Sequence, residues 1–252
     1  MRIATFNILN GRTLSDDQVD PARLADAVKG LDADVLALQE VDRNQPRSEY
    51  ADLTAIAAEA MGAVEHCFVA ALSGSPGATW MAATGDEQPD AAAYGIALLS
   101  RHPVSSWQVV RLPAVPVRVP MRFRGRRRPI LVRDEPRVAV AADIEMPRGP
   151  LTVVCTHLSF LPYWNGHQLR GLVRALASHR RPLVLAGDLN MGPARAADIT
   201  GLRQLASALT FPADRPREQI DHALADGPVE AESSYAVQLP LSDHQALVVD
   251  LA

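Results

Sequence analysis

The sequence predicts a layered α/β protein that forms one domain, and one observation supports each part of this prediction. Short apolar runs of strand length alternate along the 252 residues with amphipathic segments whose apolar side chains recur at helical spacing. No Gly/Ser-rich linker and no break in composition divides the chain. A chain of this length buries a large core within one unit, so we expect one domain over residues 1–252.

Three helices are expected from capping residues and apolar spacing. The first begins at Asp20 and Pro21, which suit the cap and the first turn of a helix, and Gly30 marks its expected end. Its apolar face comprises Leu24, Ala27, Val28 and Leu31. The same spacing recurs over residues 53–60 and 169–176, so all three helices are expected to pack one face against a sheet.

Apolar runs with the length and composition of β-strands make up the rest of the regular structure. They span residues 35–38, 95–99, 138–144, 151–156, 182–186, 220–224 and 245–251, and a further apolar run, residues 3–6, follows Met1. Continuous apolarity, as in residues 35–38, is typical of a strand buried on both faces. We therefore expect sheets that are covered by other layers.

Two long segments interrupt this pattern and are expected at the surface. Residues 73–93 are rich in small and polar side chains, and residues 112–136 contain five prolines. The second segment also carries a basic burst, Arg122, Arg124, Arg126, Arg127 and Arg128. The burst fits a solvated hairpin turning at Gly125, since charge runs usually face water, and it also fits an electropositive arm beside a phosphate site. Substrate selection tends to lie in loops of this kind.

Charge and the lack of export signals limit the function classes. The formal net charge of -4 argues against a dedicated polyanion binder, so any phosphate-bearing substrate is expected to be met locally. The start does not resemble a signal peptide, and no run of 18 apolar residues suits a transmembrane segment. We expect a cytoplasmic protein, and no protein partner can be inferred. Cys67 and Cys155 form no disulfide or metal pattern.

Polar clusters stand at the ends of the apolar runs. They are Thr5-Phe6-Asn7, Leu38-Gln39-Glu40, Thr156-His157-Leu158, Gly187-Asp188-Leu189-Asn190, Ile220-Asp221-His222 and Ser242-Asp243-His244. Each cluster alone has an ordinary explanation as a turn cap, loop charge or Asx-turn. Together they would require several independent loops to place polar residues at strand ends by accident, so we interpret them as one site.

The residue types in these clusters suit metal-assisted phosphoester hydrolysis, which needs a cation, an activated water and a proton source. Glu40 and Asp243 are hard oxygen ligands for Mg²⁺ or Mn²⁺, with Asn7 as a neutral ligand or positioning group. His157 and His244 are candidates for the general acid or base, with pKa values expected near working pH. Two thiols are too few for a thiolate zinc site.

Asp188 and Asn190 stand two residues apart after a strand and are expected to point the same way, so that both can reach one phosphate.

The ordered motifs resemble those of a known superfamily. They are Thr5 to Ile8, Leu38 to Val41, Gly95 to Arg101, Thr156 to Leu158, Gly187 to Asn190, Ile220 to His222 and Ser242 to His244. In this order they resemble the endonuclease/exonuclease/phosphatase superfamily, which has the DNase I-like fold. The resemblance implies a four-layer αββα sandwich, with two mixed β-sheets packed face to face and helices outside.

The resemblance also implies a role for each site residue. The metal site comprises Glu40, Asp243 and the supporting Asn7; Asp188 activates water or transfers a proton, and Asn190 holds the phosphate. His244, oriented by Asp221, contacts a phosphoryl oxygen or acts as the base, and His157 stands on the leaving-group side. Arg47, Tyr94 and Arg101 are the candidate substrate-binding residues.

The expected function is a Mg²⁺- or Mn²⁺-dependent phosphoesterase, in particular a phosphodiesterase acting on a small or lipid-derived phosphoester. A nuclease is the leading alternative, although the acidic balance and the lack of a basic stripe interleaved with aromatic residues count against it. A non-catalytic binding module that keeps the fold is the alternative from another class. Such a module would be expected to lose a ligand or a histidine, and this chain has lost neither.

Overall fold

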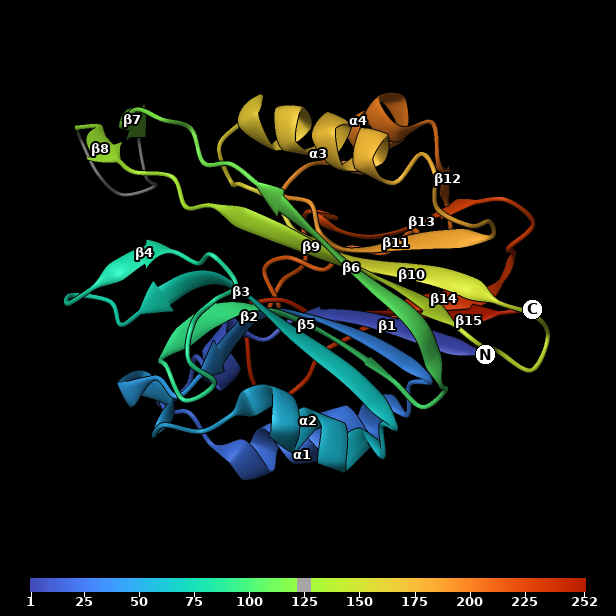
Figure 1. The fold of residues 1–252 in the computed structure, drawn as a ribbon, viewed down its shortest axis with the longest axis horizontal. Coiled ribbons are helices and arrows are strands. Elements are labelled where there is room, and N and C mark those ends of the chain that lie inside the picture. Colours follow the sequence, from blue (N-terminus) through green and yellow to red (C-terminus); the bar gives the residue numbers. More distant parts are fainter. Residues whose placement is uncertain (122–127) are drawn as a thin grey trace.

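The computed structural model describes residues 1–121 and 128–252 as a sandwich of four layers. Two large sheets pack face to face, and helices cover both outer faces (Figure 1). Helices α1 (Pro21–Leu31) and α2 (Leu53–Met61) lie on one side, and α3 (Trp164–Ala175) and α4 (Pro193–Thr200) lie on the other. The predicted αββα sandwich is confirmed.

The first sheet has seven strands in the order β14-β15-β1-β2-β5-β3-β4. Their bounds are β1 Arg2–Asn7, β2 Val35–Arg43, β3 Glu65–Gly74, β4 Trp80–Ala82, β5 Ala93–Ser100, β14 Ala231–Val237 and β15 Ala246–Leu251. Strands β1 and β2 are parallel, whereas β5 and β15 run antiparallel to their neighbours. The sheet is therefore mixed, as expected.

The second sheet has six strands in the order β12-β13-β11-β10-β9-β6. Their bounds are β6 Val104–Leu112, β9 Arg137–Ile144, β10 Leu151–His157, β11 Leu183–Asp188, β12 Arg203–Gln204 and β13 Asp221–Asp226. The β10–β11 pair is parallel, and the other pairs are antiparallel. Two short 3₁₀ turns, Leu9–Gly11 and Pro46–Ser48, follow β1 and β2 in the chain.

Alternation along the strands builds one core between the sheets and another under each helix pair. In β2, Val35 and Ala37 face the opposite sheet, while Leu36 and Leu38 pack under α1 and α2. In β11, Val184 faces the opposite sheet. Because successive side chains point to opposite faces, a strand with apolar residues at every position needs cover on both sides.

All predicted strands are present, and most extend further than the apolar runs. The structure adds β3, β6 and β14, whose outer positions are exposed and whose sequences are correspondingly mixed in polarity. Helix α4 was also missed. The first helix runs one residue past Gly30, because Asp32 instead adopts the left-handed cap with φ 46°.

The two expected surface excursions contain short strands. In the first, β4 pairs with the end of β3 as a hairpin. In the second, β7 (Val119–Met121) pairs antiparallel with β8 (Ile130–Val132), which agrees with a hairpin. The predicted turn at Gly125 and all but the last arginine of the basic burst lie outside the described residues.

Strand direction brings the polar clusters to one end of the sandwich. The carboxyl ends of β1, β2, β10 and β11 lie there with the starts of the antiparallel β5, β9, β13 and β15. Both chain termini lie at the opposite end (Figure 1). Among residues 1–121 and 128–252, no helix is long and apolar enough to cross a membrane.

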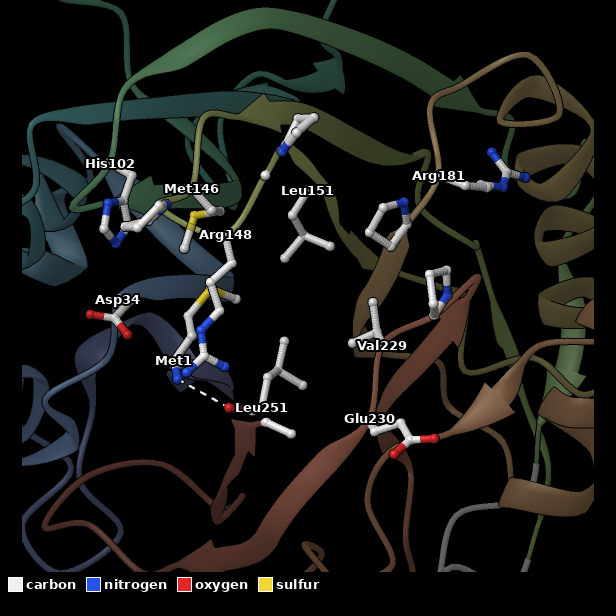
Figure 2. Close-up of a pocket in the computed structure, with 16 residues that line it drawn as sticks. Met1, Asp34, His102, Met146, Arg148, Leu151, Arg181, Val229, Glu230 and Leu251 are labelled. Carbon is white, nitrogen blue, oxygen red and sulfur yellow. Dashed lines mark hydrogen bonds between the residues drawn. The ribbon is translucent and has the colours of Figure 1, made fainter.

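A cavity of about 650 Å³ opens at the end with the termini (Figure 2). Its wall combines apolar side chains such as Leu151 and Val229 with the charged Arg148 and Glu230. The amino group of Met1 donates a hydrogen bond to the Leu251 carbonyl beside it. None of the candidate catalytic or metal-binding residues lines this cavity, so the chemistry belongs to the other end of the sandwich.

Candidate active site

A second cleft, of about 580 Å³, lies at the end of the sandwich where the polar clusters meet. Both sheets contribute to its wall. The lining residues are Glu40, Tyr94, Val132, Arg133, Glu135, Arg137, His157, Phe160, Asp188, Asn190, Phe211, Glu218, Ile220 and His244. Five of the sequence-predicted catalytic and metal residues are in this set: Glu40, His157, Asp188, Asn190 and His244.

Asn7 joins the two sheets at the base of the cleft. Its amide Nδ2 donates to Glu40 Oε1 at 3.1 Å in the same sheet and to Asp188 Oδ2 at 3.2 Å in the opposite sheet. Its Oδ1 accepts from the Leu9 amide at 3.1 Å. The Asn7 side chain therefore links Glu40 and Asp188 across the two sheets, and its Oδ1 also contacts the backbone.

Glu40 reaches the cleft through an irregularity in β2. Regular alternation would turn its side chain toward α1 and α2, as for Leu36 and Leu38. The register with β5 instead shifts between Gln39 and Val41, and Glu40 has φ 55°, in the left-handed region. A bulge of this kind re-aims a side chain, and such local strain is found at functional sites.

His244 is held by a buried carboxylate. Its Nδ1 lies 2.9 Å from Asp221 Oδ2, and the same oxygen accepts from Thr210 Oγ1 at 2.5 Å. The Phe211 ring packs beside the imidazole with centroids 4.9 Å apart. Ser242 ties this loop to β1, donating from Oγ to the Asn7 carbonyl at 2.5 Å. The expected orientation of His244 by Asp221 is therefore present in the geometry.

His157 has a different partner, which the sequence interpretation missed. Its Nδ1 lies 3.3 Å from Nη1 of Arg137, the first residue of β9, and its Nε2 lies 3.4 Å from Asp188 Oδ2. Asn190 Nδ2 is 3.3 Å from the same Nε2. A signal was available, since Arg137 is a charged residue at the end of an apolar run, as the other site residues are.

The pKa values of the two histidines are shifted in opposite directions by their surroundings. Burial disfavours the imidazolium of His244, but the Asp221 charge and hydrogen bond outweigh it and raise the pKa to about 9. Burial, then the Arg137 charge, lowers the pKa of His157 well below its usual value. The expectation that both histidines titrate near working pH is corrected by this geometry.

The pKa of the Asp188 carboxyl lies near neutral pH. Burial raises the pKa of this carboxyl to about 7, and the negative charge of Asp221 contributes in the same direction. Its Oδ2 lies 3.4 Å from His157 Nε2 and 3.8 Å from His244 Nε2, and its Oδ1 accepts from the Asn190 amide at 2.9 Å. A carboxylate in this position is suited to accept a proton from water.

Of the three candidate substrate-binding residues, the structure brings one to the cleft. Tyr94 lines the wall and is buried, and burial raises its phenol pKa. Arg47 stands behind it, with its guanidinium 5.4 Å from the Tyr94 ring and paired with Asp42 through both Nε and Nη2. Because its guanidinium is paired with Asp42, Arg47 packs behind Tyr94 and is not among the residues that line the cleft.

Arg101 requires a correction. It follows β5, which starts at the cleft and runs antiparallel to β2, so that its end lies at the far side of the sheet. There its Nε donates to the Met61 carbonyl at 2.8 Å and its Nη1 to Asp32 Oδ1 at 2.8 Å. Arg101 therefore joins two helix ends and does not reach the substrate cleft.

The donor set at the cleft fits a hard divalent cation. Glu40 Oε2 accepts no hydrogen bond from the described part of the chain, whereas Oε1 is held by Asn7. Burial raises the pKa of Glu40, and the negative charge of Asp243 raises it further. Asp243 is half-buried and is not among the residues that line the cleft. Its charge and that of Glu40 repel each other, and the oxygens of such a pair suit Mg²⁺ or Mn²⁺ as ligands.

One atom each of Asp188, Asp221 and His244 also lie within 4.8 Å of one another, which is a spacing that can hold an ion. Asp221 and His244 already bind each other in this group.

The fold and the cleft together define a two-sheet sandwich with a carboxylate–histidine site at its strand ends. The chain belongs to the Endonuclease/Exonuclease/phosphatase family, whose model matches residues 4–244. Members of this family are hydrolytic phosphoesterases, and they include phosphatases and nucleases. No curated protein sequence matches the chain.

Solved structures share the fold at low sequence identity. An endonuclease/exonuclease/phosphatase from Beutenbergia cavernae is 24% identical with a TM-score of 0.71, over 100% of this chain and 71% of that one. A mannosyl-6-phosphatase from Bacteroides thetaiotaomicron is 15% identical with a TM-score of 0.62, over 100% and 99%. A humanized TDP2 from D. rerio is 15% identical with a TM-score of 0.56, over 100% and 98%. These likenesses establish the DNase I-like fold.

Proposed function

We propose that this protein is a divalent-metal-dependent phosphodiesterase that acts on a small or lipid-derived phosphoester. The observation that carries the proposal is the position of Asp188. Its carboxylate has a pKa of about 7, lies within 4 Å of two histidines with opposite charge preferences, and is joined to Glu40 through Asn7. That arrangement supplies a base, a cationic donor and a neutral donor in one cleft.

Each residue has a distinct part in the proposed hydrolysis. Asp188, oriented by Asn7 and by the Asn190 amide, accepts the proton of the attacking water. His244, charged and fixed by Asp221, donates a hydrogen bond to the phosphoryl oxygen on which negative charge develops.

His157 is neutral, and its Nε2 lies 3.4 Å from Asp188 Oδ2, so it is the candidate hydrogen-bond donor to the leaving oxygen.

Mg²⁺ or Mn²⁺, held by Glu40 and Asp243 when bound, would polarise the phosphoryl group and lower the pKa of water.

The residues that line the cleft favour a compact substrate over a long polymer. The lining alternates Glu135 and Glu218 with Arg133 and Arg137, so it does not offer a continuous basic surface for a long polyanion. Phe160 and Phe211 add aromatic surface that suits an apolar or lipid-derived portion of a substrate. The net charge of -4 acts in the same direction.

A substrate panel tests the proposal. Bis-p-nitrophenyl phosphate, p-nitrophenyl phosphate, plasmid DNA and phospholipid vesicles are compared with Mg²⁺, with Mn²⁺ and with excess EDTA. We expect the fastest metal-dependent turnover on a small or lipid diester and none in EDTA. Faster hydrolysis of the monoester would contradict the diester assignment. Full activity in EDTA would contradict the metal requirement, and no turnover of any ester would favour the non-catalytic binding module.

A nuclease remains the second candidate because the β7–β8 hairpin borders the cleft. Val132 and Arg133 belong to the lining, and Arg128 precedes β8. If this edge followed a nucleic-acid backbone, Arg128→Gln with Arg133→Gln would weaken DNA binding and reduce the log-log salt slope by about 0.9 for each lost phosphate contact. The matched control is Arg148→Gln with Arg180→Gln, away from the cleft.

We expect weak DNA binding at physiological salt and little difference between the two double variants. Tight, steeply salt-dependent duplex binding that only the Arg128/Arg133 variant loses would establish the nuclease instead.

A further inference from the structure

Exposed apolar side chains are concentrated at the end of the sandwich that holds the cleft. Among residues 1–121 and 128–252, eleven large hydrophobic side chains are exposed, and three of them lie elsewhere: Val64 before β3, Val109 in β6 and Tyr235 in β14. The other eight lie on loops or hairpins beside the strand ends at the cleft: Leu14, Tyr50, Met81, Val117, Ile130, Leu131, Tyr163 and Leu209. Single exposed apolar residues are ordinary, but a concentration at one end of a molecule marks an interaction surface.

Three of the eight belong to the β7–β8 hairpin and the residues that lead into it. The hairpin forms a two-stranded sheet of its own and stands apart from the two large sheets (Figure 1). Pro120 pairs with Leu131 across the hairpin, and both are exposed. Leu131 and Val117 are 64% and 62% exposed, and Ile130 is 40% exposed. A two-stranded hairpin has no core of its own, so these apolar side chains are left in water.

The same segment is the most basic part of the chain. Residues 117–133 contain seven of the 25 Lys and Arg residues and none of the 29 Asp and Glu residues. Three of these arginines lie in the described part of the chain, where they are exposed and have no carboxylate oxygen within 4.0 Å: Arg118, Arg128 and Arg133. The net charge of the whole chain is -4, so a strongly positive segment stands on an otherwise acidic molecule.

Hydrogen bonds fix the base of the hairpin beside the cleft. The buried Asp134, which follows β8, accepts from the Val115 amide at 3.1 Å and from Ser159 Oγ at 2.7 Å. Both stems of the hairpin are thereby tied to the loop that follows β10. Val132 and Arg133, at the end of the hairpin, line the cleft. A surface that binds the hairpin therefore lies next to the mouth of the cleft.

We propose that the hairpin, through residues 117–121 and 128–133, is a peripheral docking site for an anionic lipid bilayer. Its apolar side chains enter the boundary between headgroups and acyl chains, and its arginines contact the negative headgroups. A nucleic-acid backbone would account for the arginines but not for the exposed Val117 and Leu131. The proposal goes beyond the proposed hydrolysis, because bilayer binding requires no turnover.

The test measures co-sedimentation of the full chain with sucrose-loaded vesicles in EDTA. Vesicles of phosphatidylcholine alone are compared with vesicles that contain about 30% phosphatidylserine, at about 0.1 M salt and at higher salt. We expect binding to the vesicles with phosphatidylserine, much weaker binding to phosphatidylcholine alone, and a loss of affinity as salt rises.

Val117→Ser with Leu131→Ser tests the apolar contact. Val64→Ser with Tyr235→Ser is the matched control, because these side chains are 62% and 40% exposed away from the cleft. The control should bind like the wild type, and the hairpin variant should bind at least about tenfold more weakly, because it loses apolar burial in the bilayer. All four side chains are exposed, so the thermal midpoint of each variant should stay near that of the wild type.

Arg118→Gln with Arg128→Gln tests the charge. Each arginine near an anionic surface contributes about fivefold in affinity, so this variant should bind about 25-fold more weakly at low salt. Arg148→Gln with Arg180→Gln, at exposed positions away from the cleft, should bind like the wild type.

A wild type that does not sediment with phosphatidylserine vesicles would overturn the proposal. Equal binding by the serine variant and the wild type would also overturn it, because the apolar side chains would then not enter the bilayer. Titration with a DNA duplex tests the other polyanion: tight binding that the arginine variant loses and the serine variant keeps would assign the hairpin to nucleic acid. Since vesicle binding is measured without turnover, its failure is distinguishable from failure of the proposed hydrolysis.

Discussion

Replacing Asp221 by asparagine should move the pH range in which the enzyme works. Asp221 makes the largest favourable contributions to the charged form of His244, whose pKa is about 9 where an ordinary histidine has 6.5. At about 1.4 kcal/mol for each tenfold change, that difference corresponds to about 3 kcal/mol in favour of the imidazolium. Without the carboxylate only weaker charges oppose burial, so we expect the pKa to return to about 6.5 or below.

The effect on activity follows from the sign of the titration. If His244 must be charged, wild-type kcat/KM should fall as pH rises through about 9, and the variant should fall through about 6.5. At pH 7.5 the charged fraction drops from about 97% to about 10%, so activity should decrease at least about tenfold. On the acidic side of the profile, activity should rise as Asp188 loses its proton, with a pKa of about 7 in the wild type. This limb should also move to lower pH in the variant, because the Asp221 charge contributes to raising the Asp188 pKa.

The assay is kcat/KM for bis-p-nitrophenyl phosphate between pH 5.5 and 10 with saturating Mg²⁺ or Mn²⁺. Asp226→Asn is the control, since this carboxylate lies at the other end of the same strand and pairs with Arg181 at the surface. It should reproduce the wild-type profile. An Asp221→Asn enzyme that keeps its falling limb near pH 9 would refute the assignment of His244 as the charged donor.

Four further substitutions test the rest of the site and its support. Glu40→Gln should weaken Mn²⁺ binding and abolish metal-dependent turnover while the unfolding midpoint stays near wild type; unchanged metal affinity by calorimetry would remove Glu40 from the ligand set. Asp188→Asn should lower kcat by about two to four orders of magnitude, and a loss below about threefold with chemistry rate-limiting would exclude it as the base. His157→Ala should be mild on a p-nitrophenyl diester and severe on an alkyl diester, because only the second leaving group needs a donor; equal losses on both would reject that role. Gly187→Ala should destabilise the protein by about 3 kcal/mol or prevent folding, because the added Cβ would lie 2.0 Å from a carbonyl oxygen of β10 and the residue has φ 147°. The control Gly171→Ala on α3 adds a Cβ that meets nothing within 4 Å, so it should be neutral or slightly stabilising in urea unfolding. Similar unfolding midpoints for the two variants would contradict the close approach at Gly187.

Much of the fold was predictable because its signals are local. Capping at Asp20, the apolar face of the first helix and the continuous apolarity of residues 35–38 each depend on neighbours in sequence, and each was confirmed. Edge strands such as β6 and β14 were missed because one side of each is solvated and carries few apolar residues. The left-handed cap is at Asp32 and not at Gly30, so that Leu31 stays in the helix and is buried in the core.

The sequence by itself determined which residues would be available at the ends of the strands: Asn7, Glu40, His157, Asp188 and His244 all follow apolar runs or precede one. Four of them line one cleft, and Asn7 donates to two of these four. This agrees with that expectation, since parallel strands end at the same edge of a sheet.

Only the tertiary structure decided how these groups act. Three features of the site depend on how separate parts of the chain pack together. They are the bulge that turns Glu40 inward, the pairing of Arg47 with Asp42 and the contact of Arg137 with His157. The opposite pKa directions of the two histidines follow from that packing, because burial and the sign of the nearest charge are properties of the assembled cleft. A linear pattern can place an ionisable group at a strand end, but its charge depends on neighbours that the pattern does not contain.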